Sequence, residues 1–166
     1  MADVRTIELT VNGQAVRRAV QPRQHLVDFL REALGLKGSH LGCEHGVCGA
    51  CTVEVDGRVV RGCLTLAVQV EGRRVRTIEG VSQDGDAADL QEAFVRRNAL
   101  QCGFCTPGMV LAANELLEMK PDATRDEVRA WMGGNYCRCT GYHAIVDAIC
   151  ETLEARAGRG RTGAAA

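Results

Sequence analysis

Hydrophobic and polar residues alternate over residues 7–11, which is the pattern of a half-buried β-strand. The dipeptide Asn12-Gly13 follows and tolerates the positive φ angles of a two-residue hairpin turn. Apolar residues over 16–20 suit the return strand. The same pattern predicts a second hairpin over residues 52–61, with its turn at Asp56-Gly57.

Residues 25–36 carry apolar side chains at helical spacing, so a helix is expected to pack on these strands. Segments 64–70 and 74–78 are then expected to complete a small mixed sheet around this helix. Residues 82–86 are polar and include a glycine, which favours a flexible linker.

Beyond this linker the apolar residues recur at helical spacing. The sequence Thr106-Pro107 suits a helix start, and Thr124 and Glu127 form the pattern of a capping box. Four helices are predicted: 88–100, one beginning at Thr106-Pro107 and ending before Pro121, one after Thr124, and 144–155. The tail from Gly158 is expected to be disordered because it is short of apolar residues.

The chain of 166 residues is long enough for one ordinary domain or two small ones. The change of periodicity near residue 80 predicts an α+β fold with two domains. Residues 1–79 would form a sheet domain, and residues 80–166 a four-helix bundle with its disordered tail.

Composition narrows the class of protein. Net charge is −1 and aromatic residues make up 4%, so neither a basic surface nor a stacking platform for nucleic acid is indicated. No stretch approaches the roughly 20 apolar residues of a membrane span, and the first residues lack the apolar core of an export signal. A cytoplasmic protein without a transmembrane segment is therefore expected.

Nine cysteines are unusually many for a chain of this length. Their number is odd, and they are clustered rather than spread along the chain. In a reducing compartment such clusters are more often metal ligands than disulfides. The cysteines are therefore the candidate chemistry of this protein.

The first cluster of thiols combines a loop with one distant residue. Cys43, Cys48 and Cys51 follow the spacing Cys-x4-Cys-x2-Cys, and Cys63 comes twelve positions later. The hairpin over 52–61 would return the chain, so that Cys63 meets the loop. This is the spacing of plant-type ferredoxins, whose four thiolates hold a 2Fe-2S cluster.

The second cluster of thiols consists of two tight pairs. Cys102 and Cys105 form a Cys-x2-Cys turn, and Cys137 and Cys139 form a Cys-x-Cys turn. Each pair precedes a predicted helix, whose N-terminus would stabilise an anionic group. The Cys-x-Cys spacing is unusual for zinc, so a second 2Fe-2S cluster is favoured.

These residues also have alternative interpretations. Zinc could replace iron at either set, although its ligands usually come as two short-spaced pairs. His45, two residues after Cys43, could serve as in a Rieske site, but four thiols already suffice and a loop residue at the solvent edge is favoured. Cys150 shares a helix face with apolar residues and is expected to be a small buried hydrophobe.

Three motifs together resemble the small iron–sulfur subunit of the molybdenum hydroxylases, the family of xanthine dehydrogenase, aldehyde oxidoreductase and aerobic carbon monoxide dehydrogenase. They are Gly-Cys-Glu-His-Gly-Val-Cys-Gly-Ala-Cys-Thr (42–52), Gln-Cys-Gly-Phe-Cys-Thr-Pro-Gly-Met (101–109) and Gly-Asn-Tyr-Cys-Arg-Cys-Thr-Gly-Tyr (134–142). The resemblance runs from about Ile7 to Leu153, and all eight candidate ligand thiols match in type and order.

The resemblance implies a plant-type ferredoxin-like (β-grasp) domain followed by a helical-bundle 2Fe-2S domain. It implies a large subunit with a molybdenum–pterin cofactor, a medium subunit with FAD, and a dimer of heterotrimers. Electrons would pass from molybdenum through the proximal cluster (Cys102, Cys105, Cys137, Cys139) and then the distal cluster (Cys43, Cys48, Cys51, Cys63) to FAD. By the same resemblance, Gln101 and Cys139 would contact the pterin.

The sequence thus predicts the electron-transfer subunit of a molybdenum oxidoreductase, with no catalytic residue of its own, because it has no nucleotide-binding glycine motif and no evident acid–base group. A free-standing two-cluster carrier and a zinc-stabilised interaction module are the alternatives. A mobile carrier would usually have an acidic docking face, which a net charge of −1 supports little.

Overall fold

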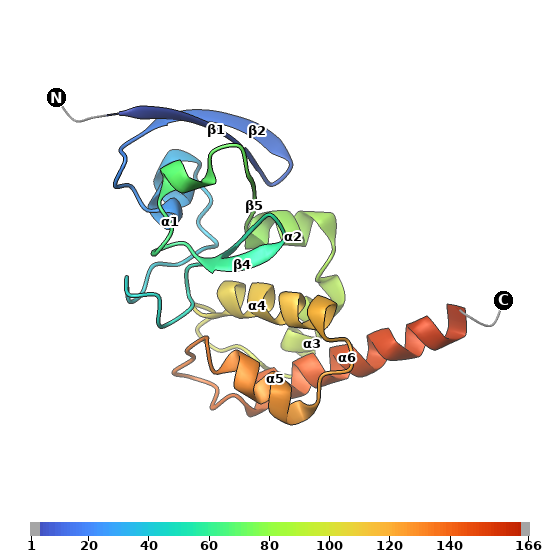
Figure 1. Ribbon diagram of the computed structural model, residues 1–166. Helices are drawn as coiled ribbons and strands as arrows, with labels where there is room; N and C mark the ends of the chain where they lie inside the picture. Colours follow the sequence, from blue (N-terminus) through green and yellow to red (C-terminus); the bar gives the residue numbers. More distant parts are fainter. Residues whose placement is uncertain (1–3, 164–166) are drawn as a thin grey trace.

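The computed structural model describes residues 4–163, and its first half is built on a mixed five-stranded sheet (Figure 1). The strand order is β2-β1-β5-β3-β4, with β1 parallel to β5 and the other neighbours antiparallel. The strands are β1 (Arg5–Val11), β2 (Gln14–Val20), β3 (Thr52–Val55), β4 (Arg58–Arg61) and β5 (Arg74–Arg76).

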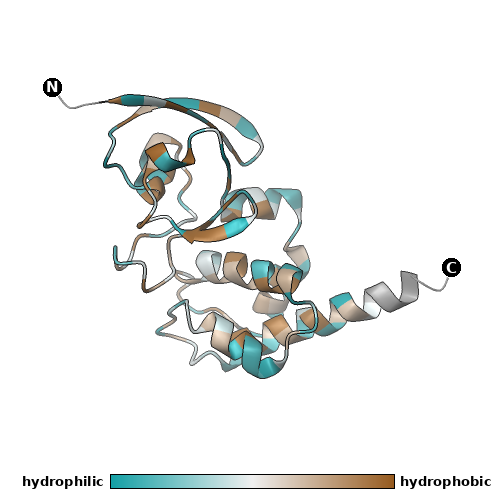
Figure 2. Ribbon diagram, viewed as in Figure 1, coloured by the Kyte–Doolittle hydropathy of each residue, from teal (hydrophilic) through white to brown (hydrophobic). Residues whose placement is uncertain are grey.

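Both predicted hairpins are confirmed. Asn12 and Gly13 have φ angles of 49° and 78°, and Asp56 and Gly57 have 50° and 82°. These two-residue turns need positive φ at both positions, which asparagine, aspartate and glycine tolerate. Figure 2 shows hydrophilic and hydrophobic residues alternating along the β1–β2 hairpin, as expected for strands with one buried face.

The helix expected over 25–36 is shorter than predicted. It consists of α1 (Leu26–Asp28) and a π-helical turn, η1 (Phe29–Ala33). Gly35 takes a φ of 71°, and the Leu36 amide donates to the Leu30 carbonyl at 2.9 Å. This closing hydrogen bond beside a left-handed glycine ends the helix before Leu36.

The prediction that 64–70 is a strand is wrong. Only Leu66 forms a bridge, to His25, and residues Ala67–Val70 form the 3₁₀ helix η2. The Gln69 side chain accepts a hydrogen bond from the Leu66 amide at 2.8 Å, and the Gln69 amide donates to the Leu66 carbonyl at 2.9 Å. These local bonds compete with the strand ladder.

The linker expected over 82–86 is mostly helical, because α2 (Ile78–Asp84) includes its first three residues and ends at the left-handed Gly85. Val81 is fully buried, which anchors this helix to the core. The Arg76 guanidinium pairs with Asp84 and Asp86 at 3.1 and 2.5 Å. The polar side chains that suggested a linker therefore hold the helix against the sheet.

Four helices form the second half. They are α3 (Ala88–Arg96), α4 (Thr106–Met119), α5 (Arg125–Met132) and α6 (His143–Gly163). α3 and α5 each pack on both α4 and α6. The capping box of Thr124 and Glu127 at the start of α5 is confirmed.

Two helix ends differ from the prediction. α3 stops at Arg96 instead of Leu100, because Asn98 takes a positive φ of 51°. α6 continues to Gly163, beyond the end expected at residue 155. The last three residues of the tail expected from Gly158 lie outside the described residues.

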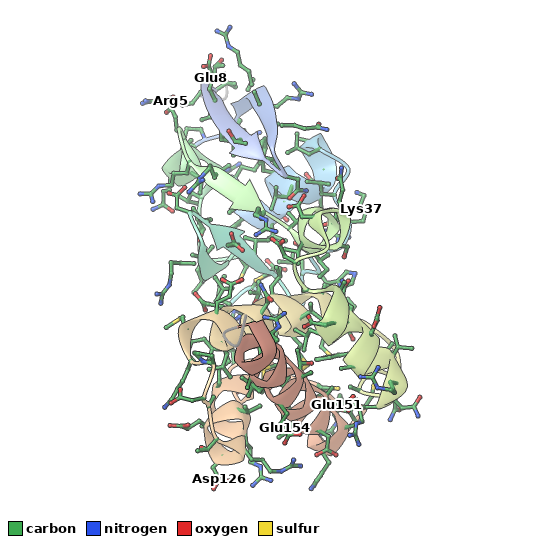
Figure 3. The ribbon with its side chains drawn as sticks, turned by 90° about the vertical axis from the view of Figure 1, so that its right-hand side faces the viewer. Arg5, Glu8, Lys37, Asp126, Glu151 and Glu154 are labelled. Carbon is green, nitrogen blue, oxygen red and sulfur yellow. The ribbon has the colours of Figure 1, made fainter. Side chains whose placement is uncertain are left out.

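Each half has its own hydrophobic core. The sheet core includes Phe29 and Leu30, and the helical core includes Phe94, Met109 and Ile149. Figure 3 shows labelled charged residues at the two ends of the molecule, Arg5 and Glu8 on the sheet and Asp126, Glu151 and Glu154 on the helices. None of the helices in the described region is long and apolar enough to span a membrane.

The two halves meet where α4 packs against β3 and β4 (Figure 1). Glu115 of α4 lies in this contact with 8% of its surface exposed. Its carboxylate accepts a hydrogen bond from the Val59 amide at 3.0 Å and pairs with Arg58 at 3.1 Å. Polar contacts therefore join β4 to α4 across the boundary.

Candidate metal centres

The first set of thiols gathers between the loop 42–51 and the end of β4. Cys51 and Cys63 are each 1% exposed, whereas Cys43 and Cys48 are half-buried. The Gly62 amide donates to the Cys51 carbonyl at 3.1 Å, and the Cys63 amide donates to the Cys51 sulfur at 3.4 Å. The hairpin of β3 and β4 thus returns Cys63 to the loop, as its spacing predicted.

Backbone amides supply the polar environment of this set. The amides of His45 and Cys48 each donate to the Cys43 sulfur at 3.4 Å. The amides of Cys48 and His45 lower the pKa of the Cys43 thiol to about 6. Burial raises the pKa of the Cys51 thiol to about 11. A metal must therefore displace a firmly held proton from Cys51, while Cys43 ionises readily.

Two glycines let the loop fold tightly. Gly46 and Gly49 take φ angles of +77° and +75°, which side chains rarely adopt. A Cβ on Gly46 would lie 2.2 Å from Leu64, and a Cβ on Gly49 would lie 2.5 Å from Asn135. The loop that carries three thiols is thus pressed against both halves of the protein.

The second set of thiols lies between the helices. Cys102 and Cys105 precede α4, and Cys137 and Cys139 precede α6. The sulfurs of Cys102 and Cys139 are 3.6 Å apart, and the Cys105 thiol interacts directly with the Cys137 thiol. The two motifs, more than thirty residues apart in the sequence, thus meet as two close pairs.

This set is more open than the first. Cys102 and Cys139 are exposed, and Cys105 and Cys137 are half-buried. Burial raises the pKa of the Cys105 thiol to about 12. Burial opposes ionisation of Cys137, yet hydrogen bonds from the Thr140 hydroxyl and the Cys139 backbone lower its pKa.

Side chains brace the loop that carries Cys137. The Thr140 hydroxyl donates to the Cys137 sulfur at 3.1 Å. The Tyr142 hydroxyl accepts from the Cys137 amide and donates to the Asn135 carbonyl, both at 2.9 Å. These hydrogen bonds orient one ligand and can stabilise negative charge on its sulfur.

The pairing of the thiols suits a cluster with two irons. Two sulfurs bound at about 2.3 Å to one tetrahedral ion lie roughly 3.7 Å apart, close to the 3.6 Å between Cys102 and Cys139. In the first set, Cys43 interacts with Cys48, and Cys51 with Cys63. Each set therefore offers two thiols to each of two ions. Among the described residues, no three ligating side chains are grouped as a single metal ion would require.

Gln101 and Cys139, the residues expected to contact a pterin, lie together at the surface. The Gln101 side-chain amide donates to the Cys139 carbonyl at 3.0 Å, and both residues are exposed. Their role toward a pterin stays a prediction. The hydrogen bond holds Gln101 beside the open set of thiols.

His45 lies at the solvent edge as expected, whereas Cys150 is less buried than expected. His45 is exposed, and it takes part in the first set through its backbone amide. Cys150 is half-buried on α6 and packs against the helical core. Neither side chain is required to complete either set.

No separate signal in the amino-acid pattern pointed to Arg61, Asn135 and Tyr142. Asn135 is 2% exposed, and its side chain connects the two cysteine loops. Its position in Gly134-Asn-Tyr136, directly before Cys137, was the available hint. Arg61 ends a strand that reads as an ordinary polar edge, so only the tertiary contact reveals it.

Two protein families match the chain, one in each half. The 2Fe-2S iron-sulfur cluster binding domain matches residues 9–78. The family described as a 2Fe-2S binding domain matches residues 77–150. Each match contains one complete set of thiols, so the cysteine sets and these families together support two 2Fe-2S clusters.

Similar proteins are subunits of oxidoreductases. The chain is 52% identical over 146 residues to the caffeine dehydrogenase subunit gamma of Pseudomonas sp. (strain CBB1), covering 86% of this chain and 87% of that protein. It is 42% identical to the xanthine dehydrogenase iron-sulfur-binding subunit of Escherichia coli O157:H7, covering 87% and 91%. In the crystal structure of quinoline 2-oxidoreductase from Pseudomonas putida 86, a chain of 51% identity superposes with a TM-score of 0.88, covering 94% of this chain and 96% of that one.

Proposed function

Because the chain belongs to the small iron–sulfur subunits of the molybdenum hydroxylases, we propose that it relays electrons between a molybdenum–pterin site and FAD held by partner subunits. Such subunits work within oxidoreductase complexes and transfer electrons. The two 2Fe-2S clusters would supply the one-electron chemistry when bound. The described residues supply ligands, hydrogen bonds and the spacing between the two sites.

The proposed ligands are the two sets of thiols described above. Cys43, Cys48, Cys51 and Cys63 would hold the distal cluster, and Cys102, Cys105, Cys137 and Cys139 the proximal cluster. The pairing within each set is the observation that carries this assignment. We further propose that residues 1–79 form a plant-type ferredoxin-like (β-grasp) domain and residues 80–166 a four-helix-bundle domain.

The open set is the better candidate for the end that receives electrons. Cys102 and Cys139 are exposed beside Gln101, so a cofactor carried by a large subunit could approach them closely. By contrast, Cys51 and Cys63 are enclosed by this chain. Electrons would then pass to the distal cluster and on to FAD in a medium subunit.

The proposed assembly is a heterotrimer of large, medium and small subunits that pairs into a dimer. The names of the relatives support a complex, because they call those proteins subunits. The cytoplasm is the proposed location, since nine free thiols are compatible with a reducing compartment.

Metal and flavin content of the complex captured through this chain tests the proposal. We expect about four iron per chain, with about one molybdenum and one FAD. Iron without molybdenum and flavin would leave a free-standing carrier as the function. Zinc in place of iron would contradict the proposal, because the thiols would then hold no 2Fe-2S cluster.

The substrate of the complex is proposed to be an N-heteroaromatic compound. Two similar proteins, 52% and 51% identical to this chain, are named for caffeine and quinoline, which both contain nitrogen in aromatic rings. Steady-state assays of the complex with purines, quinolines and aldehydes would test this class. Preferential turnover of aldehydes would contradict it.

A further inference from the structure

One arginine reaches across the boundary between the two cysteine loops. Arg61 ends β4 and lies two residues before Cys63. Its guanidinium donates to the Thr52 hydroxyl, to the Gly134 carbonyl at 2.6 Å, and to the Asn135 side-chain oxygen at 3.3 Å. The planar fork of arginine suits three such bonds, which a lysine could not form in one geometry.

Asn135 completes the connection from the other side. Its side-chain nitrogen donates to the Gly49 carbonyl at 3.2 Å, while its side-chain oxygen accepts from Arg61. Gly49 lies between Cys48 and Cys51, and Asn135 lies two residues before Cys137. Asn135 has 2% of its surface exposed, and each end of its amide has one partner, so loss of either partner would leave a buried polar group unsatisfied.

The backbone is also tightly fitted at this point. The Tyr136 amide donates to the Cys48 carbonyl at 2.8 Å, so the residue before Cys137 is hydrogen-bonded directly to a cysteine of the first set. A Cβ on Gly108 of α4 would lie 2.3 Å from the Gly49 carbonyl oxygen. The loops therefore have little room to slide against each other.

We propose that Arg61 and Asn135 form a clamp that fixes the separation of the two metal centres, and thereby positions them for electron transfer. The inference rests on the proposed function, because it presumes a cluster at each set of thiols. Both are positioning residues, since they contact the loops and no ligand sulfur. All three oxygens bound by Arg61 are neutral, so its charge also remains available to favour the more negative, reduced clusters.

The test is electron paramagnetic resonance of the dithionite-reduced complex captured through this chain. Two reduced 2Fe-2S clusters are both paramagnetic, and their mutual splitting depends on the distance between them. We expect Arg61→Gln to retain about four iron per chain. The splitting should become smaller and more broadly distributed. The reduction potentials of both clusters should shift to more negative values. Unchanged splitting with iron retained would overturn the clamp.

Two further variants separate the clamp from general stability. Arg61→Lys keeps the charge, so it should change the splitting in the same way as Arg61→Gln while retaining the reduction potentials. It also decides the matter if Arg61→Gln fails to assemble, because wild-type splitting in Arg61→Lys would overturn the clamp. Glu115→Gln removes the Arg58 ion pair at the same boundary, away from the cysteine loops, and should lower the melting temperature alone. A wild-type complex without two 2Fe-2S signals would instead refute the proposed function.

Discussion

The two sets of thiols differ in how they are enclosed and in what supports them. The first set has two fully buried thiols, and backbone amides donate to its sulfurs. The second has two exposed thiols, and the side chains of Thr140 and Tyr142 brace its more enclosed half. The chain thus encloses half of the first set, whereas two thiols of the second set lie open at the surface.

The two centres also differ in which of their hydrogen bonds a mutation can remove. Hydrogen bonds from backbone amides persist when side chains change, so the first centre depends on the conformation of its loop. Hydrogen bonds from Thr140 can be removed singly, so the second centre can be tuned one group at a time.

The largest expected effect comes from removing one ligand of each set. Cys63→Ser and Cys102→Ser should each lower iron from about four to about two per chain, because each cluster needs four ligands. Cys63→Ser should also cost about 1–3 kcal/mol of unfolding free energy, since it buries an unpaired hydroxyl, whereas exposed Cys102→Ser should cost about 0.5 kcal/mol or less. Iron analysis and denaturant titration measure both.

Cys150→Ala is the control for these two variants and should retain about four iron per chain. Cys102→Ser should also stop electron flow to FAD, which stopped-flow reduction of the complex would detect. Full turnover in this variant would contradict the proposed route through the second centre.

A glycine pair separates backbone strain from close contact. Gly49 and Gly103 have φ angles of +75° and +81°, so alanine at either costs about 1–2 kcal/mol of strain. Only Gly49→Ala adds a collision, with Asn135, which should cost about 1–3 kcal/mol more. Equal melting temperatures for the two variants would show that the loop contact contributes nothing.

Thr140→Val should affect one centre alone. It removes the hydroxyl that donates to the Cys137 sulfur, and a hydrogen bond to such a charged group is worth about 1.5–3 kcal/mol. Because that bond favours the more negative reduced state, the potential of the second cluster should become more negative. Redox titration followed by electron paramagnetic resonance measures this, with the first cluster as the internal reference.

The smallest effect concerns α5, the helix before the Cys137 loop. The Lys120 side chain, then the Thr124 backbone and hydroxyl, lower the pKa of Glu127 to about 2. Its unfolded pKa is about 4.3, so the stabilisation is complete above that pH and is lost as pH falls through about 2. The difference in melting temperature between wild type and Glu127→Gln should vanish over this interval; a difference independent of pH would contradict it.

Local signals identified most of the fold. Both hairpins were readable because Asn12-Gly13 and Asp56-Gly57 favour the required turns whatever surrounds them. The capping box of Thr124 and Glu127 is equally local. The short helix at 67–70 was missed because the apolar pattern does not show the local bonds between Leu66 and Gln69. The helical nature of 82–84 was missed because the polar side chains there pair with Arg76 of the sheet.

The sequence by itself determined which thiols could act together in the first set, because a short hairpin must return Cys63 to its loop. It also indicated that the other two cysteine pairs belong together. The tertiary structure alone decided how open each set is, since burial depends on the packing of both halves. It alone brought Arg61 to Asn135 across 74 residues of chain, because such a contact arises only when the sheet and the helices pack against each other.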